Sequence, residues 1–163
     1  MDEITLLAEF LRSRNEIDRR IAFIIGYPTA PGPIGEFIAS KVFGIELMEY
    51  ATQKGFDGHF ASGPLAGRTV SVELYGKQDD ILDDHPEEDP DYFLVITNPR
   101  TAHGMTSGTS RPFIIEHIYL FDAKTLLWEE AEIYPVQRNK IFPLTEKQRS
   151  LLHLFNPSAL CRS

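Results

Sequence analysis

The hydrophobic periodicity of this chain changes once, near residue 44, and that change limits the fold more than any other feature. Up to position 42, apolar side chains recur every three or four residues, which is the spacing of a buried helix face. Beyond Gly44 they form short runs bounded by Gly and Pro, which is typical of strands. Helices, then a run of strands, then helices predict an α+β fold with a central, mostly antiparallel sheet.

The element boundaries follow from caps and breakers. An N-terminal helical segment, with apolar residues at positions 4, 7, 11, 17, 21 and 24 on one buried face, should end at Gly26. A second helix should begin at Pro33 and end at Gly44. A capping-box pattern at Thr145 and Gln148 predicts a final helix. The five predicted strands span residues 45–48, 58–61, 69–75, 92–97 and 113–121, and the C-terminal helices span 123–132 and 145–155.

Length and composition indicate one domain over residues 1–163. A chain of 163 residues with 42% hydrophobic residues can bury a proper core. It contains no apolar run long enough to cross a bilayer and no secretory signal pattern, so we expect no membrane partner. Its one cysteine, Cys161, cannot form an internal disulfide. We therefore expect a cytoplasmic protein.

The net charge of −8 is concentrated in one segment. Outside that segment the chain carries 16 acidic and 16 basic side chains, so a nucleic-acid partner or a protein partner both remain open. We expect flexible loops at about residues 78–91, where the acids lie, and at about 98–111, which is rich in Gly, Ser and Thr. The oligomeric state is left open. The acidic residues of the segment are Asp79, Asp80, Asp83, Asp84, Glu87, Glu88, Asp89 and Asp91.

Three carboxylates come from three successive predicted elements. Glu36 lies on the second helix, Asp57 lies in a turn between Gly55 and Gly58, and Glu73 lies on the third strand. Carboxylate oxygens are the ligands that Mg²⁺ prefers, and a bound cation of this kind can activate water against a phosphate. The spacing therefore predicts a magnesium site with Asp57 and Glu73 as direct ligands and Glu36 orienting a metal-bound water.

This arrangement resembles the PD-(D/E)XK nuclease superfamily. The resemblance covers residues 33 to about 77 and rests on a helix with a glutamate, then a three-stranded meander with a Gly-hydrophobic-Asp-Gly turn. It implies a restriction-endonuclease-like core and a metal-dependent nuclease. The chain is also similar, over most of its length, to an uncharacterised bacterial protein family, through the segments Gly35-Glu36-Phe37-Ile38-Ala39, Gly55-Phe56-Asp57-Gly58 and Gly63-Pro64-Leu65-Ala66-Gly67.

The chain departs from the nuclease pattern at two positions. Glu36 matches the helix acid and Asp57 the motif aspartate, but Ser71 stands where the resemblance implies Asp or Glu, and Glu73 stands where it implies lysine. Lys77 is on the same strand face as Glu73, about 13 Å further along, and is the candidate catalytic lysine. Lys41 is a second candidate. The acidic segment also takes the place of the helix that the superfamily has between its third and fourth strands.

Two functions therefore remain open. The first is a magnesium-dependent nuclease with Glu36, Asp57, Glu73 and Lys77 at a degenerate active site. The alternative is a non-catalytic binding or regulatory module of the same fold that contacts a protein partner. A third reading places a small-molecule site in the loop at 98–111. Each carboxylate also has an ordinary structural role open to it: a turn aspartate for Asp57, and solvent-facing glutamates at positions 36 and 73.

Overall fold

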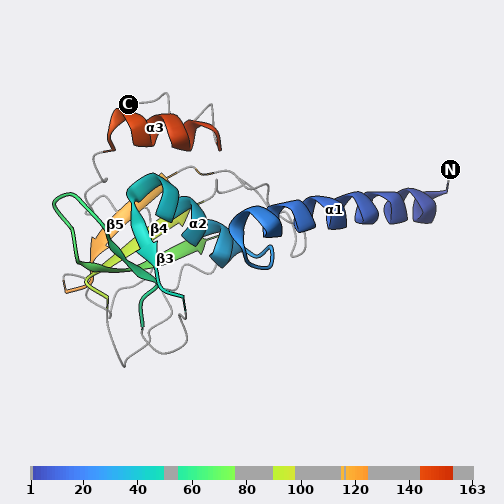
Figure 1. Cartoon of the computed structure of the whole chain (residues 1–163). Helices are drawn as coiled ribbons and strands as arrows, with labels where there is room; N and C mark the ends of the chain where they lie inside the picture. The colour runs from blue at the N-terminus through green and yellow to red at the C-terminus, as the bar shows by residue number, and fades with distance from the viewer. Residues whose placement is uncertain are drawn as a thin grey trace.

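The computed structural model describes residues 2–49, 55–75, 90–97, 115, 117–124 and 144–155. Two helices come first, then five strands of a single sheet, and then one further helix (Figure 1). The predicted α+β fold with N-terminal helices and a mostly antiparallel five-stranded sheet is confirmed. The elements are α1 (Glu3–Ile25), α2 (Pro31–Phe43), β1 (Ile45–Leu47), β2 (Gly58–Phe60), β3 (Thr69–Tyr75), β4 (Tyr92–Thr97), β5 (His117–Asp122) and α3 (Glu146–His153).

The strands lie in the order in which they occur in the chain. β1, β2 and β3 form an antiparallel meander, and β4 pairs with β5 in the antiparallel sense. β3 and β4 run parallel, with Val70 opposite Tyr92 and Tyr75 opposite Thr97. A parallel pair cannot be joined by a tight turn, so β3 and β4 need a longer connection. That connection contains residues 76–89, which are outside the described part of the chain and include most of the predicted acidic loop.

α2 covers one face of the sheet. It begins at Pro31, two residues earlier than predicted, and ends as predicted at Gly44, whose φ of 66° suits glycine. Gly35 packs closely against Leu74, because an added Cβ there would lie 3.0 Å from the Leu74 Cβ. The core on this face also includes Leu152 of α3. Its buried members are Ile38, Ala39, Val42, Phe43, Ile45, Phe60, Val70, Val72, Leu94, Ile96, Ile115, Ile118 and Leu152.

The opposite face of the sheet is also apolar. Phe93, Val95, Phe121 and Ala123 form a second buried cluster, with Tyr119 packed against it. β4 therefore buries side chains on both of its faces, which explains why its sequence is a nearly continuous apolar run. The prediction of a buried strand at residues 92–97 is confirmed.

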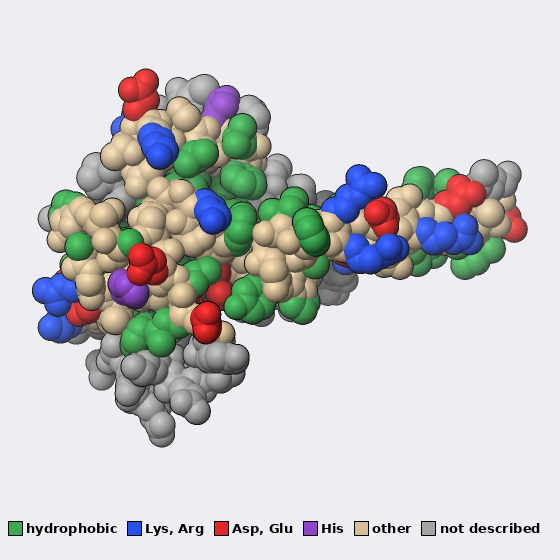
Figure 2. All heavy atoms as spheres, viewed as in Figure 1, with side chains coloured by type: hydrophobic (Ala, Val, Ile, Leu, Met, Phe, Trp, Pro, Cys, Tyr) green, Lys and Arg blue, Asp and Glu red, His purple; other side chains and the backbone are tan. Residues whose placement is uncertain are grey.

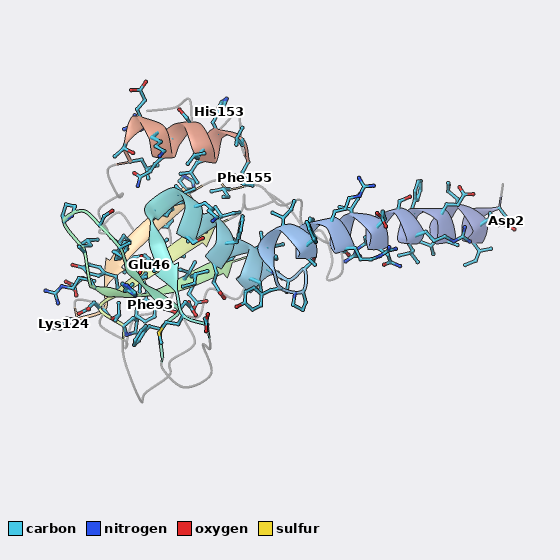
Figure 3. All side chains as sticks on the ribbon, in the orientation of Figure 1. Asp2, Glu46, Phe93, Lys124, His153 and Phe155 are labelled. Atoms are coloured by element: carbon cyan, nitrogen blue, oxygen red, sulfur yellow. The ribbon has the colours of Figure 1, made fainter. Side chains whose placement is uncertain are left out.

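α1 does not bury the face that its periodicity predicted. It is one continuous helix capped by the Asp2 side chain, and none of its residues is buried. Its main contact is with α2, and the Thr29 hydroxyl donates to the Asp18 carbonyl oxygen. The helix projects from the body of the protein, and Asp2 at its tip lies far from Glu46 and Phe93 of the sheet region (Figure 3). The physical reason is that periodicity identifies an apolar face but not what covers it.

Of the predictions for the C-terminal part of the chain, the described residues confirm the capping box and the final helix. The capping box at Thr145 and Gln148 is present, and α3 follows it. β5 begins at His117 and ends at Asp122, so Asp122 ends a strand, and its carboxylate accepts a hydrogen bond from the backbone N–H of Lys124. The predicted helix at 123–132 lies almost entirely outside the described residues, as does the predicted loop at 98–111. In the described ranges, no helix combines the length and the hydropathy that crossing a membrane requires.

The core position of Leu94 leads to a stability prediction. Leu94→Ala should lower the free energy of unfolding by about 2 to 5 kcal/mol, because it leaves a cavity beneath α2. Leu154→Ala removes the same atoms from a side chain that is 74% exposed, and it should change stability by less than about 0.5 kcal/mol. Chemical denaturation of both variants checks this; equal losses would contradict the described core.

Candidate functional site

The candidate site lies where β2 stops and β3 continues. β2 pairs with β3 only at Thr69 and Val70, so beyond Val70 the described residues provide no strand partner on that side of β3. The backbone N–H of Asp57 donates to the Val70 carbonyl oxygen at 3.0 Å, although Gly58 is the residue paired with Val70. Two residues therefore lie against one, which is the arrangement of a β-bulge. A bulge of this kind redirects the side chain of Asp57 at the end of its strand.

Gly58 is required by the neighbouring strand. A Cβ at this position would overlap the backbone carbonyl oxygen of Glu46 and would lie 3.0 Å from the Ile45 side chain. The Asp-Gly pair of the sequence thus has two separate causes. The glycine allows β1 and β2 to approach each other closely, and the aspartate provides the group at the open edge.

The Asp57 carboxylate accepts a backbone hydrogen bond from β3 that a neighbouring strand would otherwise accept. Its Oδ2 accepts hydrogen bonds from the backbone N–H of Val72 at 2.7 Å and from the Ser71 hydroxyl at 3.3 Å. Both bonds stabilise the ionised form, yet the pKa of Asp57 is raised, because burial outweighs them. Ser71 marked a departure from the nuclease pattern in the sequence, and in the structure it is a direct partner of the motif aspartate.

Glu36 approaches Asp57 from α2. A Cβ at Gly32 would lie 3.8 Å from Glu36 Oε1, so the side chain folds back along the first turns of the helix. The pKa of Glu36 is raised, first by burial and then by the negative charge of Asp57. Among the described residues, no Lys, Arg or His forms an ion pair with either carboxylate. The result is a partly buried pair of like charges, in place of the dipole-stabilised surface glutamate that is the ordinary alternative for Glu36.

The other predicted site residues lie elsewhere. Glu73 alternates along β3 with Val72 and Leu74, which face α2, so it is on the same face as Ser71 and on the opposite face from Glu36. Lys77 is outside the described residues. The Lys41 ammonium lies over the Phe37 ring, 5.3 Å from its centroid, and pairs with neither carboxylate.

The structure therefore joins Asp57 to Ser71 by a hydrogen bond and places Glu36 close enough for the charge of Asp57 to raise its pKa. Across the ranges that the structure describes, no three His, Cys, Asp or Glu side chains form a group that could hold a metal ion. The predicted role of Glu73 as a direct metal ligand stays a prediction. Two carboxylates remain a sufficient protein contribution for Mg²⁺, which keeps several of its waters.

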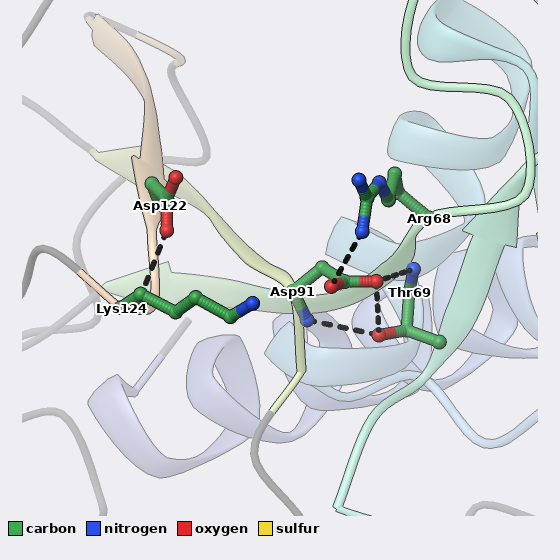
Figure 4. A network of polar contacts seen from close by, with 5 residues as sticks. All are labelled: Arg68, Thr69, Asp91, Asp122 and Lys124. Carbon is green, nitrogen blue, oxygen red and sulfur yellow. Dashed lines mark hydrogen bonds and ion pairs between the residues drawn. The ribbon is translucent and has the colours of Figure 1, made fainter.

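Sequence reasoning assigned Asp91 to the acidic loop, whereas the structure gives it a structural role (Figure 4). Asp91 Oδ2 accepts from the backbone N–H and the hydroxyl of Thr69, and the Thr69 hydroxyl accepts from the Asp91 backbone N–H. Arg68 adds an ion pair at 3.3 Å. The pKa of Asp91 is lowered, chiefly by the backbone N–H of Thr69. The signal in the sequence is that Thr69 and Asp91 each stand at the start of one of two parallel strands.

A second polar pair lies on the outer strands. His59 Nε2 and Glu46 Oε2 are 3.1 Å apart, and the two residues are directly opposite each other across β1 and β2. The Glu46 side chain is largely exposed and the His59 side chain is partly exposed, which fits a cross-strand surface pair. Glu46 therefore provides a control carboxylate close to the candidate site but outside it.

Comparison with known proteins does not add a relative. No family profile matches the chain, and no curated protein matches its sequence. The function therefore has to be argued from the geometry of the carboxylate pair.

The raised pKa values predict how stability depends on pH. The folded state holds protons on Glu36 and Asp57 more tightly than the unfolded chain does, so the free energy of unfolding should fall as pH rises from below the ordinary carboxyl value through the raised values. Glu36→Gln removes one of these ionisations. It should raise Tm relative to the native protein at pH 7, and the difference should disappear below about pH 4.

Thermal melts between pH 3.5 and 8 measure this difference. Glu9→Gln, which changes an exposed carboxylate on α1, is the control and should keep the native pH profile. A Glu36→Gln protein that is less stable than the native one at pH 7 would contradict the like-charge pair.

Proposed function

We propose that the Glu36–Asp57 pair is the acidic centre of a magnesium-dependent, nuclease-like site that acts on phosphodiester bonds. The observation that carries the proposal is the meeting of two partly buried carboxylates with raised pKa values at the open edge of β3. Ionised side chains are costly to bury without a cation nearby. A divalent cation between them would offset both the burial and the mutual repulsion.

The donor set fits a cation that prefers oxygen. Within the described residues, both hydrogen bonds to Asp57 go to Oδ2, which leaves Oδ1 as the oxygen that can face a ligand. Glu36 on α2 would supply the second carboxylate, so that the cation would lie between Glu36 and Asp57. When bound, Mg²⁺ would supply charge neutralisation at the phosphate and a water of lowered pKa. The chain itself would hold the cation between a helix and a strand edge, both of which are fixed by the core.

The remaining roles rest on position along β3. Ser71 and Glu73 share one face, and Asp57 reaches that face through its contact with the Ser71 hydroxyl. Glu73 is our candidate for the group that accepts the proton of an attacking water, and Lys77 is the candidate cation for the departing group. The substrate class is nucleic acid, and we place the activity in the cytoplasm on the grounds of the single cysteine.

A second function has its own supporting observation. The Asp57 carboxylate completes the backbone hydrogen bonding of Val72, and Ser71 fills the place of a further metal ligand. Both contacts would persist in a protein that no longer cleaves anything. This favours a non-catalytic binding or regulatory module of the same fold, acting on a protein partner.

Cation binding and cleavage distinguish the two functions. Titration calorimetry with Mg²⁺ and Mn²⁺ should detect one site in the native protein, and Asp57→Asn or Glu36→Gln should weaken it at least about tenfold, because each removes half of the charge pair. Asn at position 57 keeps an oxygen that can accept from Val72, so the strand edge should survive. Glu46→Gln is the matched control and should bind like the native protein.

The same proteins are then incubated with supercoiled plasmid and single-stranded DNA in Mn²⁺. Cleavage that is lost in Asp57→Asn but kept in Glu46→Gln supports the nuclease. Cation binding without cleavage supports the non-catalytic module. No cation binding in the native protein would remove the basis for the metal-dependent site.

Ser71→Asp tests the site by gain of function. A third carboxylate beside Asp57 Oδ2 adds repulsion, so this variant should melt at a lower temperature than the native protein in EDTA. In Mg²⁺ the loss should be recovered, with cation affinity at least about tenfold higher than in the native protein, because charge count tunes such sites. Ser40→Asp on α2, whose hydroxyl donates to the Phe37 carbonyl oxygen, is the control and should show no recovery in Mg²⁺. Equal behaviour of the two variants would place the cation elsewhere.

A further inference from the structure

We propose that α1 is a dimerisation helix that packs antiparallel against α1 of a second copy of this chain. The helix projects from the body of the protein and carries hydrophobic side chains beside charged ones along its exposed length (Figure 2). Helices in proteins are stabilised mainly by packing of their apolar faces, and the described part of the chain provides little such packing for α1, none of whose residues is buried. The proposal goes beyond the nuclease-like site and does not rest on it.

The apolar face of α1 has a heptad arrangement. It consists of three columns, each with a spacing of seven residues, which lie side by side on an α-helix. Eight of the eleven positions are apolar, and several of these side chains are largely exposed: Ile4 69%, Phe10 62%, Ile17 57% and Ile24 65%. The columns are Ile4, Leu11, Asp18, Ile25; then Leu7, Arg14, Ile21; and then Glu3, Phe10, Ile17, Ile24.

Of the three charged positions of this face, Glu3 lies at the first residue of the helix, and the other two, Arg14 and Asp18, decide the orientation. Within one chain Arg14 and Asp18 form an ion pair at 3.6 Å. In a parallel, in-register pair of helices each would meet its own like charge in the second copy. In an antiparallel pair centred on Glu16, Arg14 lies opposite Asp18 of the second copy and Leu11 lies opposite Ile21, and both pairings occur twice. Antiparallel pairing therefore places opposite charges against each other and apolar side chains against apolar side chains.

The length of the helix suits this contact. α1 has 23 residues, which at about 1.5 Å per residue gives about 35 Å, or a little over three heptads. Its centre is close to the charged pair, so two helices can overlap along most of their length while each body lies at an opposite end. With the centre at Glu16 the overlap runs over residues 7–25 and covers the apolar residues of this face from Leu7 to Ile25 in both copies.

A membrane surface fits α1 less well than a second copy does. Helices that bind in the headgroup region of anionic membranes carry an excess of Lys and Arg on their polar face. Residues 2–25 contain five acidic and four basic side chains. Several of these already pair within the helix, as Glu16 does with Arg19 and Arg20. A lipid surface is therefore an alternative outcome of the experiment.

Sedimentation equilibrium of the full chain, from 1 to 200 µM, tests the association. The native protein should approach twice its 18.5 kDa mass as concentration rises. Leu11→Glu should raise the dimer dissociation constant at least about tenfold, because it places a charge in the contact. Thr5→Glu adds the same charge on the opposite face of α1 and should dimerise like the native protein. A native protein that stays monomeric over the whole range overturns the proposal.

Orientation is tested by disulfide crosslinking in a Cys161→Ser background. Leu11→Cys mixed with Ile21→Cys should crosslink, whereas Leu11→Cys alone should crosslink much less. Efficient crosslinking of Leu11→Cys with itself would overturn the antiparallel arrangement. Hydrogen exchange and vesicle flotation complete the test. A monomer whose α1 amides are protected by its own chain, or a monomer that floats with neutral or anionic vesicles, would also overturn the proposal.

Discussion

The parallel pairing of β3 with β4 is the interaction on which the rest of this structure depends. It joins the meander of β1, β2 and β3 to the antiparallel pair of β4 and β5, and both β3 and β4 contribute side chains to the core beneath α2. The reciprocal hydrogen bonds between Thr69 and Asp91 fix where the two strands begin relative to each other. Because a one-residue slip would exchange the two faces of a strand, this anchor also decides that Ser71 and Glu73 face away from α2.

The candidate site follows from the same pairing, because β3 is longer than its other neighbour. β2 begins only at Gly58, opposite Val70, and the Asp57 side chain provides the next hydrogen bond that β3 requires. One carboxylate oxygen is thus used for structure, while burial raises the pKa of the group as a whole. Glu36 adds a second negative charge from α2. A fold that needed only a strand end could have used a neutral side chain at position 36, so the like-charge pair is the feature that structure alone does not explain.

Much of the fold could be predicted from the sequence, because the relevant signals are local. Gly44 ends a helix through its backbone conformation, Thr145 and Gln148 cap one another, and the apolar run of β4 reflects burial on both faces. The site was predictable only as a set of residue types. That Asp57 bonds to Ser71 and Val72 depends on a bulge and on strand lengths, which arise from pairing between segments distant in the sequence. Glu73 could be assigned to a face of its strand, but not to a distance from Asp57.

The two N-terminal helices also show that local sequence signals do not determine which segments pack together. Both have apolar residues at helical spacing, yet α2 buries five residues and α1 buries none. The difference in burial between α1 and α2 depends on whether the other residues of each helix allow it to pack against the sheet. α2 is short, carries Gly35 and Ala39 where it meets the sheet, and so can approach β3 closely. α1 has most of its charges opposite its apolar face, but Arg14 and Asp18 lie inside that face itself. A buried sheet face would leave such charges without water, whereas a second α1 offers each of them an opposite charge.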